Sequence, residues 1–343
     1  MTIRFSTRRA RRWGFRSAPL WLWVLLSGVA ALEAGAGEYA GRKAALEIIK
    51  SAEVAGVDAQ WSADLLNAAK RQQSILDAIA RPAEKTKPWH EYRQIFITPR
   101  RIQEGVSFWN QHAAVLDSVS SVTGVPAEVI VAIIGVETFY GRITGNYRVI
   151  DALATLAFDY PRRSAFFTSE LEAFLLLAWE SGKDPLALKG SYAGAMGYGQ
   201  FMPSSYRAYA KRFEGEGAPD IWDNPADAIS SVANYLLEHG WRAGDEVVVG
   251  ATVNDPDPEA FAGGLKPTQS VTEWIVRGWV PSRSVSGEAT ATPIALEAES
   301  GMAYWLGLEN FYVITRYNHS AMYAMAVWEL SQSIAASRQE NAL

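Results

Sequence analysis

A single acidic side chain stands near the end of an apolar segment of the sequence. In "VPAEVIVAIIGVETFYGR", residues 125–142, Glu137 follows a long aliphatic run. Burial among apolar groups raises the pKa of a carboxyl group and keeps it protonated near neutral pH, the state that a general acid needs. A second interpretation stays open, in which Glu137 is a structural glutamate bonded to Arg142 or to a neighbouring helix. On a helix, Glu137 shares a face with Ile133, Ile134, Tyr140 and Gly141.

A glycine-rich loop is the second feature that could take part in chemistry. The segment "KGSYAGAMGYGQF", residues 189–201, combines glycines, which let a backbone approach a ligand closely, with the polar side chains of Ser191, Tyr198 and Gln200. Such a loop could instead be a turn between packed helices. Its polar groups favour the catalytic interpretation of Glu137.

Several other chemistries find no support in the sequence. The histidines at 90, 112, 239 and 319 lack metal-ligand spacing, and neither an H-E-x-x-H motif nor a P-loop occurs. Ser191 directly follows a glycine, so it is not the serine of a G-x-S-x-G elbow. The absence of cysteine excludes disulfides, thiolate metal sites, a thiol nucleophile and a lipidated cysteine.

Helical patterns dominate the elements that must position these residues. Pro82 ends the second predicted helix, and Pro126 and Gly141 mark the start and end of the apolar one. Asn224 as a cap, Pro225 at the first position, Asp227 in the first turn and Gly240 at the end delimit another. Apolar spacing predicts helices over 44–56, 64–82, 102–119, 125–142, 164–182, 203–213, 224–241 and 321–337.

Strand patterns follow Gly240. Runs rich in β-branched residues, separated by turn residues, predict a small antiparallel sheet. The expected fold class is therefore mainly α (α+β). The predicted strands are 245–253, 291–298, 302–308 and 311–317.

The N-terminus has the layout of a secretory signal. Six arginines without an acid precede a 15-residue apolar run and a small-residue stretch, with cleavage expected after Ala34 or Ala36. The run is short for a membrane span, so a membrane tether is expected only if this segment stays uncleaved. Arg11 and Arg12 leave Sec and twin-arginine export both open. We expect residues 1–36 to be a signal peptide and the chain to be exported to the periplasm.

Net charge argues against a nucleic-acid partner. The whole chain carries a formal charge of −5, and removal of residues 1–36 leaves 26 Lys and Arg against 36 Asp and Glu. Nucleic-acid binding depends on basic side chains that contact phosphates, so this balance disfavours it.

Four motifs resemble one enzyme family. "GVETFYGR", "LATLAFDYPRR", "GSYAGAMGYGQFMPSSY" and "ADAISSVANYLLEHGW" occur in the order and spacing of the membrane-bound lytic murein transglycosylase B family, and the resemblance covers roughly residues 40–330. It implies a lysozyme-like catalytic core over 123–240. The same resemblance implies an N-terminal helical region over 37–122, a small β subdomain over 241–316 and a C-terminal helix over 317–343 that returns to the core.

The resemblance also implies a reaction. Glu137 would be the only catalytic acid and base in cleaving the bond between N-acetylmuramic acid and N-acetylglucosamine, with the substrate's acetamido group in place of a second carboxylate. The product would be a 1,6-anhydromuramoyl end. Two alternatives stay open: a muramidase that uses water, for which hydrolases normally have a second carboxylate, and a non-catalytic murein-binding scaffold.

Further site residues are implied by the same motifs. Ser191 and Gln200 would hold the sugar, and Arg162 and Arg163 would bind lactyl or peptide carboxylates, unless they are only surface charges. Phe166 stands where some relatives have tyrosine. The remaining implied cleft residues are Tyr317 and Asn318 beside the acid, Tyr323 as a wall, and Tyr92, Tyr198 and Tyr235 as further aromatic or polar positions.

A calcium loop of some relatives is altered in this sequence. Its first ligand position falls on Arg212, and a cation there opposes Ca²⁺ binding. We therefore expect no metal or other cofactor, with Asp227 acting as a helix-terminus carboxylate. The remaining oxygen-bearing candidates are Glu214, Glu216 and Asp220. The expected partners are peptidoglycan glycan strands; proteins of cell-wall synthesis or division are left open, and we expect a monomer.

Overall fold

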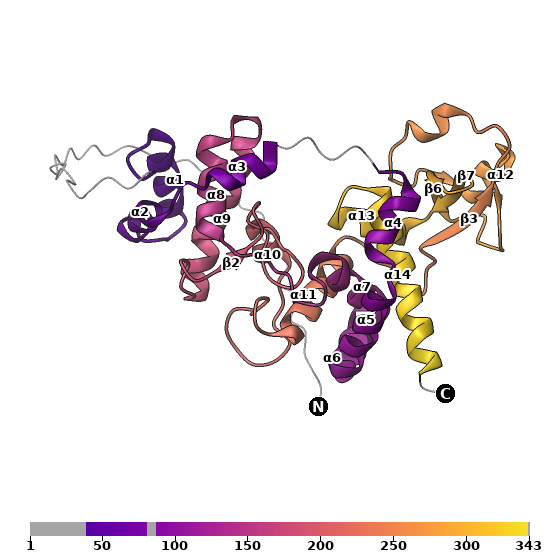
Figure 1. The fold of residues 1–343 in the computed structure, drawn as a ribbon, viewed down its shortest axis with the longest axis horizontal. Coiled ribbons are helices and arrows are strands. Elements are labelled where there is room, and N and C mark those ends of the chain that lie inside the picture. The colour runs from indigo at the N-terminus through magenta and orange to yellow at the C-terminus, as the bar shows by residue number, and fades with distance from the viewer. Residues whose placement is uncertain (1–38, 81–86, 342–343) are drawn as a thin grey trace, which may run out of the picture. The chain divides into compact units, whose positions relative to one another are not determined.

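The computed structural model describes residues 39–80 and 87–341, and these form a mainly helical protein with small antiparallel sheets (Figure 1). The prediction of a mainly α (α+β) fold is confirmed. The predicted signal peptide, 1–36, and Pro82 lie outside the described residues. The α-helices are α1 (Lys43–Val54), α2 (Ala59–Ala68), α3 (Gln73–Ala80), α4 (Trp89–Phe96), α5 (Pro99–Gln111), α6 (Ala113–Thr123), α7 (Ala127–Thr138), α8 (Val149–Asp159), α9 (Ser164–Ser181), α10 (Pro203–Tyr209), α11 (Pro225–Glu238), α12 (Val271–Val276), α13 (Glu309–Tyr317) and α14 (Ala321–Glu340).

Helix α7 carries Glu137 and is the apolar helix that the sequence predicted. Its residues are buried on nearly every side, as expected of a helix that is hydrophobic all round. Helices α5, α6, α11 and α14 pack against it, and α5, α7 and α14 lie together in Figure 1. The surrounding helices therefore fix the position of Glu137.

The main sheet has five antiparallel strands in the order β4-β6-β7-β3-β5. Strands β6 and β7 form a hairpin in which Ala298 pairs with Gly301. Beside the sheet, Trp274 and Trp279 belong to a small apolar cluster separate from the main core. The strands are β3 (Val248–Thr252), β4 (Gln269–Ser270), β5 (Val280–Pro281), β6 (Thr290–Ala298) and β7 (Gly301–Gly307), and β1 (Tyr147–Arg148) pairs with β2 (Lys189–Gly190) elsewhere.

Tertiary contacts break one predicted helix into two. The sequence predicted a continuous helix over 64–82, whereas the structure has α2 and α3 with a break between them. In the break, Lys70 N donates to Asp151 Oδ1 at 2.9 Å and Gln72 N donates to Thr155 Oγ1 at 3.0 Å. Side chains of α8 thus accept backbone N–H groups of the segment between the two helices.

Two further predictions of secondary structure were wrong or incomplete. The helix predicted over 102–119 is divided at His112 into α5 and α6. The strand predicted over 311–317 is helix α13, because Phe311, Ile314 and Thr315 face the core at helical spacing. Helices α4, α8 and α12 were not predicted. The cap Asn224 is confirmed, since its side chain accepts from Ala226 N at 3.0 Å.

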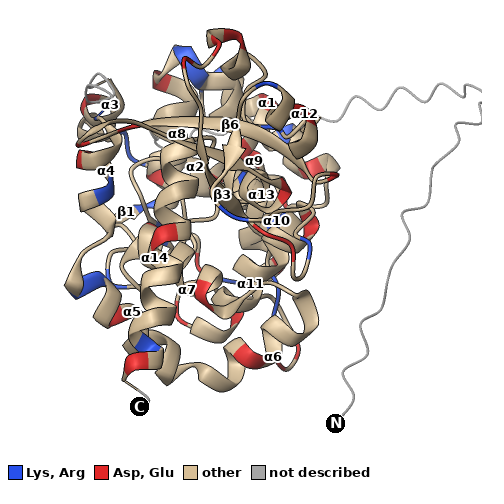
Figure 2. Cartoon of the chain, turned by 90° about the vertical axis from the view of Figure 1, so that its right-hand side faces the viewer, with Lys and Arg blue, Asp and Glu red and all other residues tan. Residues whose placement is uncertain are grey.

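Charged residues of both signs are interspersed over the helices (Figure 2). Among the described residues, no single helix is long and apolar enough to cross a membrane. Only α6 and α7 taken together pass that test, and they are bent by 115° relative to each other.

Candidate active site

Glu137 lies one residue before the end of α7 and keeps part of its surface exposed, unlike most of that helix. Tyr323, in the first turn of α14, donates its hydroxyl to Glu137 Oε1 at 2.6 Å, although the two residues are 186 positions apart. Tyr323 itself is buried. The fold therefore gives the carboxyl one specific donor and an otherwise low-polarity environment.

Burial is the main influence on this carboxyl group. It raises the pKa of Glu137 from 4.5 to about 7, against the opposing effect of the hydrogen bond from Tyr323. The charge of Glu137 in turn adds to burial in raising the pKa of Tyr92, Tyr317 and Tyr323. Three tyrosines from α4, α13 and α14 thus surround a carboxyl that can hold or release a proton near neutral pH.

The chain leaves α7 through an unusual backbone segment. Phe139 and Tyr140 have φ of 51° and 62°, in the left-handed region that non-glycine residues seldom occupy, and Gly141 follows with φ of 83°. Thr138 Oγ1 accepts from Gly141 N at 2.9 Å and donates to the Tyr198 carbonyl at 2.8 Å. Thr138 therefore joins the end of α7 to the glycine-rich loop. This role of Thr138 was not predicted; its signal in the sequence is a hydroxyl residue next to the acid.

The glycine-rich loop packs directly against this helix end. A Cβ atom at Gly141 would lie 2.0 Å from the ring of Tyr198, so only glycine fits there. Gln200, with φ of 50°, donates Nε2 to the carbonyls of Thr144 at 3.1 Å and Gly197 at 3.0 Å. Ser191 Oγ accepts from Ala195 N at 3.1 Å. These hydrogen bonds hold the loop in one shape beside Glu137.

Two tyrosines connect the loop to α13 and, in turn, α13 to α11. Tyr317 donates its hydroxyl to the Gly199 carbonyl at 2.6 Å, and Tyr235 donates to the Arg316 carbonyl at 2.6 Å. The rings of Tyr235 and Tyr317 lie 4.7 Å apart. Tyr235 is buried, and its ring packs against the ring of Tyr317.

The other predicted site residues lie at the ends of helices. Asn318 is an exposed cap that follows α13. Arg162 and Arg163 are exposed on the 3-10 turn Pro161–Arg163 between α8 and α9, and the Arg163 guanidinium lies 4.4 Å from the ring centre of Phe166. Their roles toward a substrate stay predictions.

Of the two partners left open for Glu137, the neighbouring helix is the one found, because Tyr323 of α14 donates to it. A pairing with Arg142 and a helical face shared with Tyr140 are not found. Arg142 pairs with Glu104 of α5, with Nη1 2.7 Å from Oε1, so it is not the partner of Glu137. Tyr140 does not share the helical face of Glu137, because α7 ends at Thr138 and the Tyr140 hydroxyl donates to the Arg101 carbonyl at 2.8 Å.

The loop in which the resemblance places Arg212 is occupied by the arginine side chain. Arg212 donates Nε to the Glu214 carbonyl at 2.8 Å and Nη1 to the Ala218 carbonyl at 2.9 Å. Both oxygens of the buried Asp227 accept backbone N–H groups, from Phe213 at 2.9 Å and Asp220 at 2.7 Å. Across the described ranges, no group of three or more His, Asp or Glu residues is arranged to hold a metal ion.

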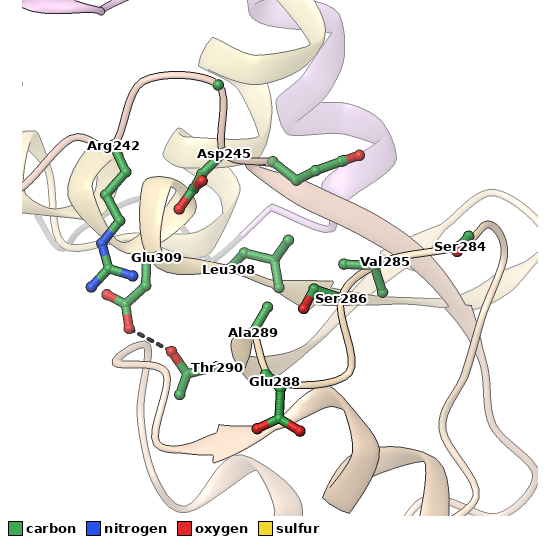
Figure 3. A pocket seen from close by; sticks show the side chains of 12 residues that line it. Arg242, Asp245, Ser284, Val285, Ser286, Glu288, Ala289, Thr290, Leu308 and Glu309 are labelled. Carbon is green, nitrogen blue, oxygen red and sulfur yellow. Dashed lines mark hydrogen bonds between the residues drawn. The ribbon is translucent and has the colours of Figure 1, made fainter.

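A pocket of about 580 Å³ opens elsewhere, at the base of the β region (Figure 3). Within it, Thr290 Oγ1 donates to Glu309 Oε1 at 2.6 Å. Arg242, Asp245 and Glu288 also line this pocket, and none of its lining residues was predicted to act on a substrate.

Comparison with known proteins identifies the family. The family model described as "Transglycosylase SLT domain" matches residues 41–332. The chain is 47% identical over 312 residues to the membrane-bound lytic murein transglycosylase B of Escherichia coli (strain K12), covering 88% of this chain and 85% of the relative. This chain belongs to the lytic murein transglycosylase family. The prediction of a lytic transglycosylase is thereby confirmed at the level of the family.

Solved structures of other lytic transglycosylases share the fold. The catenated lytic transglycosylase SltB1 of Pseudomonas aeruginosa is 51% identical, with a TM-score of 0.82 over 87% of this chain and 99% of that structure. SltB3 of Pseudomonas aeruginosa, solved in complex with NAG-anhNAM-pentapeptide, is 32% identical, with a TM-score of 0.77 over 85% of this chain and 78% of that structure.

Proposed function

We propose that this chain cleaves the β-1,4 bond between N-acetylmuramic acid and N-acetylglucosamine in peptidoglycan, with Glu137 as the only acid and base. The observation that carries this proposal is the position of Glu137 at the end of α7, where Tyr323 donates to it and burial raises the pKa of its carboxyl to about 7. A carboxyl with a pKa near the working pH can donate a proton in one step and accept one in the next. The complex of SltB3 with a NAG-anhNAM-pentapeptide supports the choice of substrate class.

The first step needs protonated Glu137. Its proton passes to the glycosidic oxygen while the bond between that oxygen and C1 of the muramoyl residue breaks. The acetamido carbonyl oxygen of the same residue bonds to C1 in place of a protein nucleophile. This step leaves Glu137 ionised, and the hydrogen bond from Tyr323 at 2.6 Å stabilises the carboxylate.

The second step returns the proton. The C6 hydroxyl of the muramoyl residue attacks C1 and displaces the acetamido oxygen, while Glu137 accepts the hydroxyl proton. A 1,6-anhydro ring results, no water is consumed, and Glu137 is protonated again. One carboxyl group therefore suffices for the complete cycle.

The surroundings of Glu137 favour this mechanism over hydrolysis. Glycoside hydrolases normally place a second carboxylate within about 5–10 Å of the first. Among the described residues, the charged neighbours that perturb Tyr92, Tyr317 and Tyr323 include no carboxylate other than Glu137. A non-catalytic scaffold has no need of a buried carboxyl that ionises only above about pH 7, because desolvating its charge destabilises the fold.

The test is mass spectrometry of fragments released from purified murein by residues 37–343. We expect 1,6-anhydromuramoyl ends that disappear with Glu137→Gln, since an amide cannot transfer the proton. Glu128→Gln, at the other end of α7, is the matched control and should retain the activity. Reducing muramoyl ends would show that water is the acceptor, and binding without release would support the scaffold.

We also propose that the enzyme works without calcium. The guanidinium of Arg212 donates to two carbonyl oxygens of the loop, Glu214 and Ala218, and so supplies a fixed positive charge there. The carboxylate of Asp227 is already occupied by two backbone N–H groups. These residues do not fit a calcium site, and no step of the reaction depends on one.

Export to the periplasm is a further part of the proposal, supported by the arginine-rich and apolar layout of residues 1–36 and by the membrane-bound relative in Escherichia coli. Cell fractionation of the full chain and of residues 37–343 tests it. Only the full chain is expected outside the cytoplasm, and it is expected as a monomer on glycan strands.

A further inference from the structure

Three arginines gather around one aromatic ring just beyond the catalytic glutamate. The guanidinium carbon atoms of Arg100, Arg101 and Arg142 lie 5.2, 5.0 and 5.7 Å from the ring centre of Phe139. Arg100 and Arg101 belong to the first turn of α5, and Arg142 follows α7. We name these three side chains the guanidinium cluster.

The guanidinium cluster carries more positive charge than its neighbours compensate. Glu104 pairs with Arg142 and is the one carboxylate that is hydrogen-bonded or ion-paired to the cluster within the described ranges. Arg101 is partly buried, and its Nε and Nη1 atoms are buried without an acceptor. A buried donor without a partner costs stability, so a purely structural role explains Arg101 poorly.

The N-terminus of α5 makes the guanidinium cluster still less favourable in the absence of an anion. A helix N-terminus carries partial positive charge and stabilises acidic residues, whereas the first turn of α5 holds two arginines and no acid. Burial also lowers the pKa of the Arg101 guanidinium, which shows that its charge is incompletely solvated. An anion beside the exposed Arg100 would offset part of this uncompensated positive charge.

Aromatic residues of α4 connect the guanidinium cluster to the surroundings of Glu137. The charge of Glu137 contributes to raising the pKa of Tyr92 on α4. The ring centre of Tyr92 lies 5.3 Å from that of Phe96. Phe96 in turn lies 5.2 Å from the guanidinium of Arg101. One aromatic step along α4 therefore separates the tyrosine beside the catalytic carboxyl from the guanidinium cluster.

We propose that the guanidinium cluster binds carboxylates of the stem peptide that the muramoyl residue of the substrate carries. Planar guanidinium groups suit carboxylates, and they donate stronger hydrogen bonds to ionised acceptors than to neutral ones. Arg100 and Arg142 are exposed and can reach a ligand, whereas Arg101 underlies them beside Phe139. This site rests on the proposed function and is distinct from the predicted pair Arg162 and Arg163.

Calorimetry on the inactive Glu137→Gln protein tests the site. The probes are a NAG-NAM-pentapeptide, the same compound with amidated carboxyl groups, and the NAG-NAM disaccharide. We expect Arg100→Gln to reduce the preference for the free pentapeptide over the other two probes by on the order of 10-fold, which corresponds to about 1.4 kcal/mol. Arg101→Gln should reduce it as well.

Arg277→Gln is the matched control, because this arginine also lies over an aromatic ring, 4.5 Å from the ring centre of Trp274, but in the β region. It should leave the preference unchanged. An unchanged preference in Arg100→Gln, or a parent protein that does not distinguish the probes, overturns the proposal. These outcomes are independent of the proposed function, which fails only if the protein with Glu137 intact releases no anhydromuramoyl ends.

Discussion

The hydrogen bond from Tyr323 to Glu137 makes a quantitative prediction about pH dependence. In the structure this bond, 2.6 Å long, lowers the pKa of Glu137, and burial sets the final value of about 7. A hydrogen bond to a charged group contributes about 1.5–3 kcal/mol, and one pKa unit corresponds to about 1.4 kcal/mol. Tyr323→Phe should therefore raise the pKa of Glu137 by about one to two units.

The assay is the rate of anhydromuramoyl release as a function of pH, expressed as kcat/KM. The free enzyme must hold Glu137 protonated, so kcat/KM should fall as pH rises through the pKa of Glu137, near 7. In Tyr323→Phe the whole descending limb should move to higher pH by the calculated amount. The pH at which this limb falls does not depend on the absolute rate, which loss of the Tyr323 hydroxyl can also reduce.

Tyr206→Phe is the matched control for this experiment. Tyr206 is buried and donates a hydrogen bond of the same length, 2.6 Å, to the Pro219 carbonyl. Its removal should leave the descending limb in place. If the limb of Tyr323→Phe does not move, or moves to lower pH, the Tyr323 hydroxyl does not stabilise the carboxylate, and burial opposed by this hydrogen bond does not set the pKa of Glu137.

Three other predictions concern stability and metal dependence. Glu137→Gln should raise the free energy of unfolding by up to about 3 kcal/mol at pH 8 and leave it unchanged at pH 4. The reason is that the folded carboxyl keeps its proton up to about pH 7, whereas the unfolded carboxyl loses its proton near pH 4.5. Urea titrations that show the same difference at both pH values would contradict this. Gly141→Ala should lower the free energy of unfolding by at least about 2 kcal/mol and abolish activity, since its Cβ would overlap the Tyr198 ring. The control Gly182→Ala, with φ of 64° and open space around it, should lower the free energy of unfolding by only about 1 kcal/mol, as measured by thermal unfolding. Equal losses of stability would exclude the overlap as the cause. EDTA and millimolar calcium should leave the melting temperature of the parent unchanged, and a clear shift would show that Arg212 does not replace a cation.

Local sequence signals predicted several elements correctly. The apolar run of α7, the cap at Asn224 and the strands β6 and β7 on either side of a turn each have a cause within a few residues. The strand predicted over 311–317 failed because β-branched and aromatic residues fit a strand as well as a buried helix over so short a span. There Asn310, just inside α13, accepts from Arg242 N at 2.9 Å, which ties the start of the helix to a distant segment.

Breaks within helices were harder to predict than their ends. No glycine or proline marks His112, where α5 gives way to α6. The break between α2 and α3 depends on Asp151 and Thr155, side chains about 80 residues away along the chain. Local propensity does not contain such information, because the stabilising partner belongs to another element.

The sequence by itself determined the family, the mainly helical fold and the position of one carboxyl at the end of an apolar helix. These follow from residue order and local periodicity, which are properties of short segments. Only the tertiary structure decided that Tyr323, 186 residues away, donates to Glu137. It also decided that burial raises the pKa of this carboxyl and that three arginines gather around Phe139. The physical reason is that desolvation and short-range hydrogen bonds depend on distances between elements, and packing sets those distances.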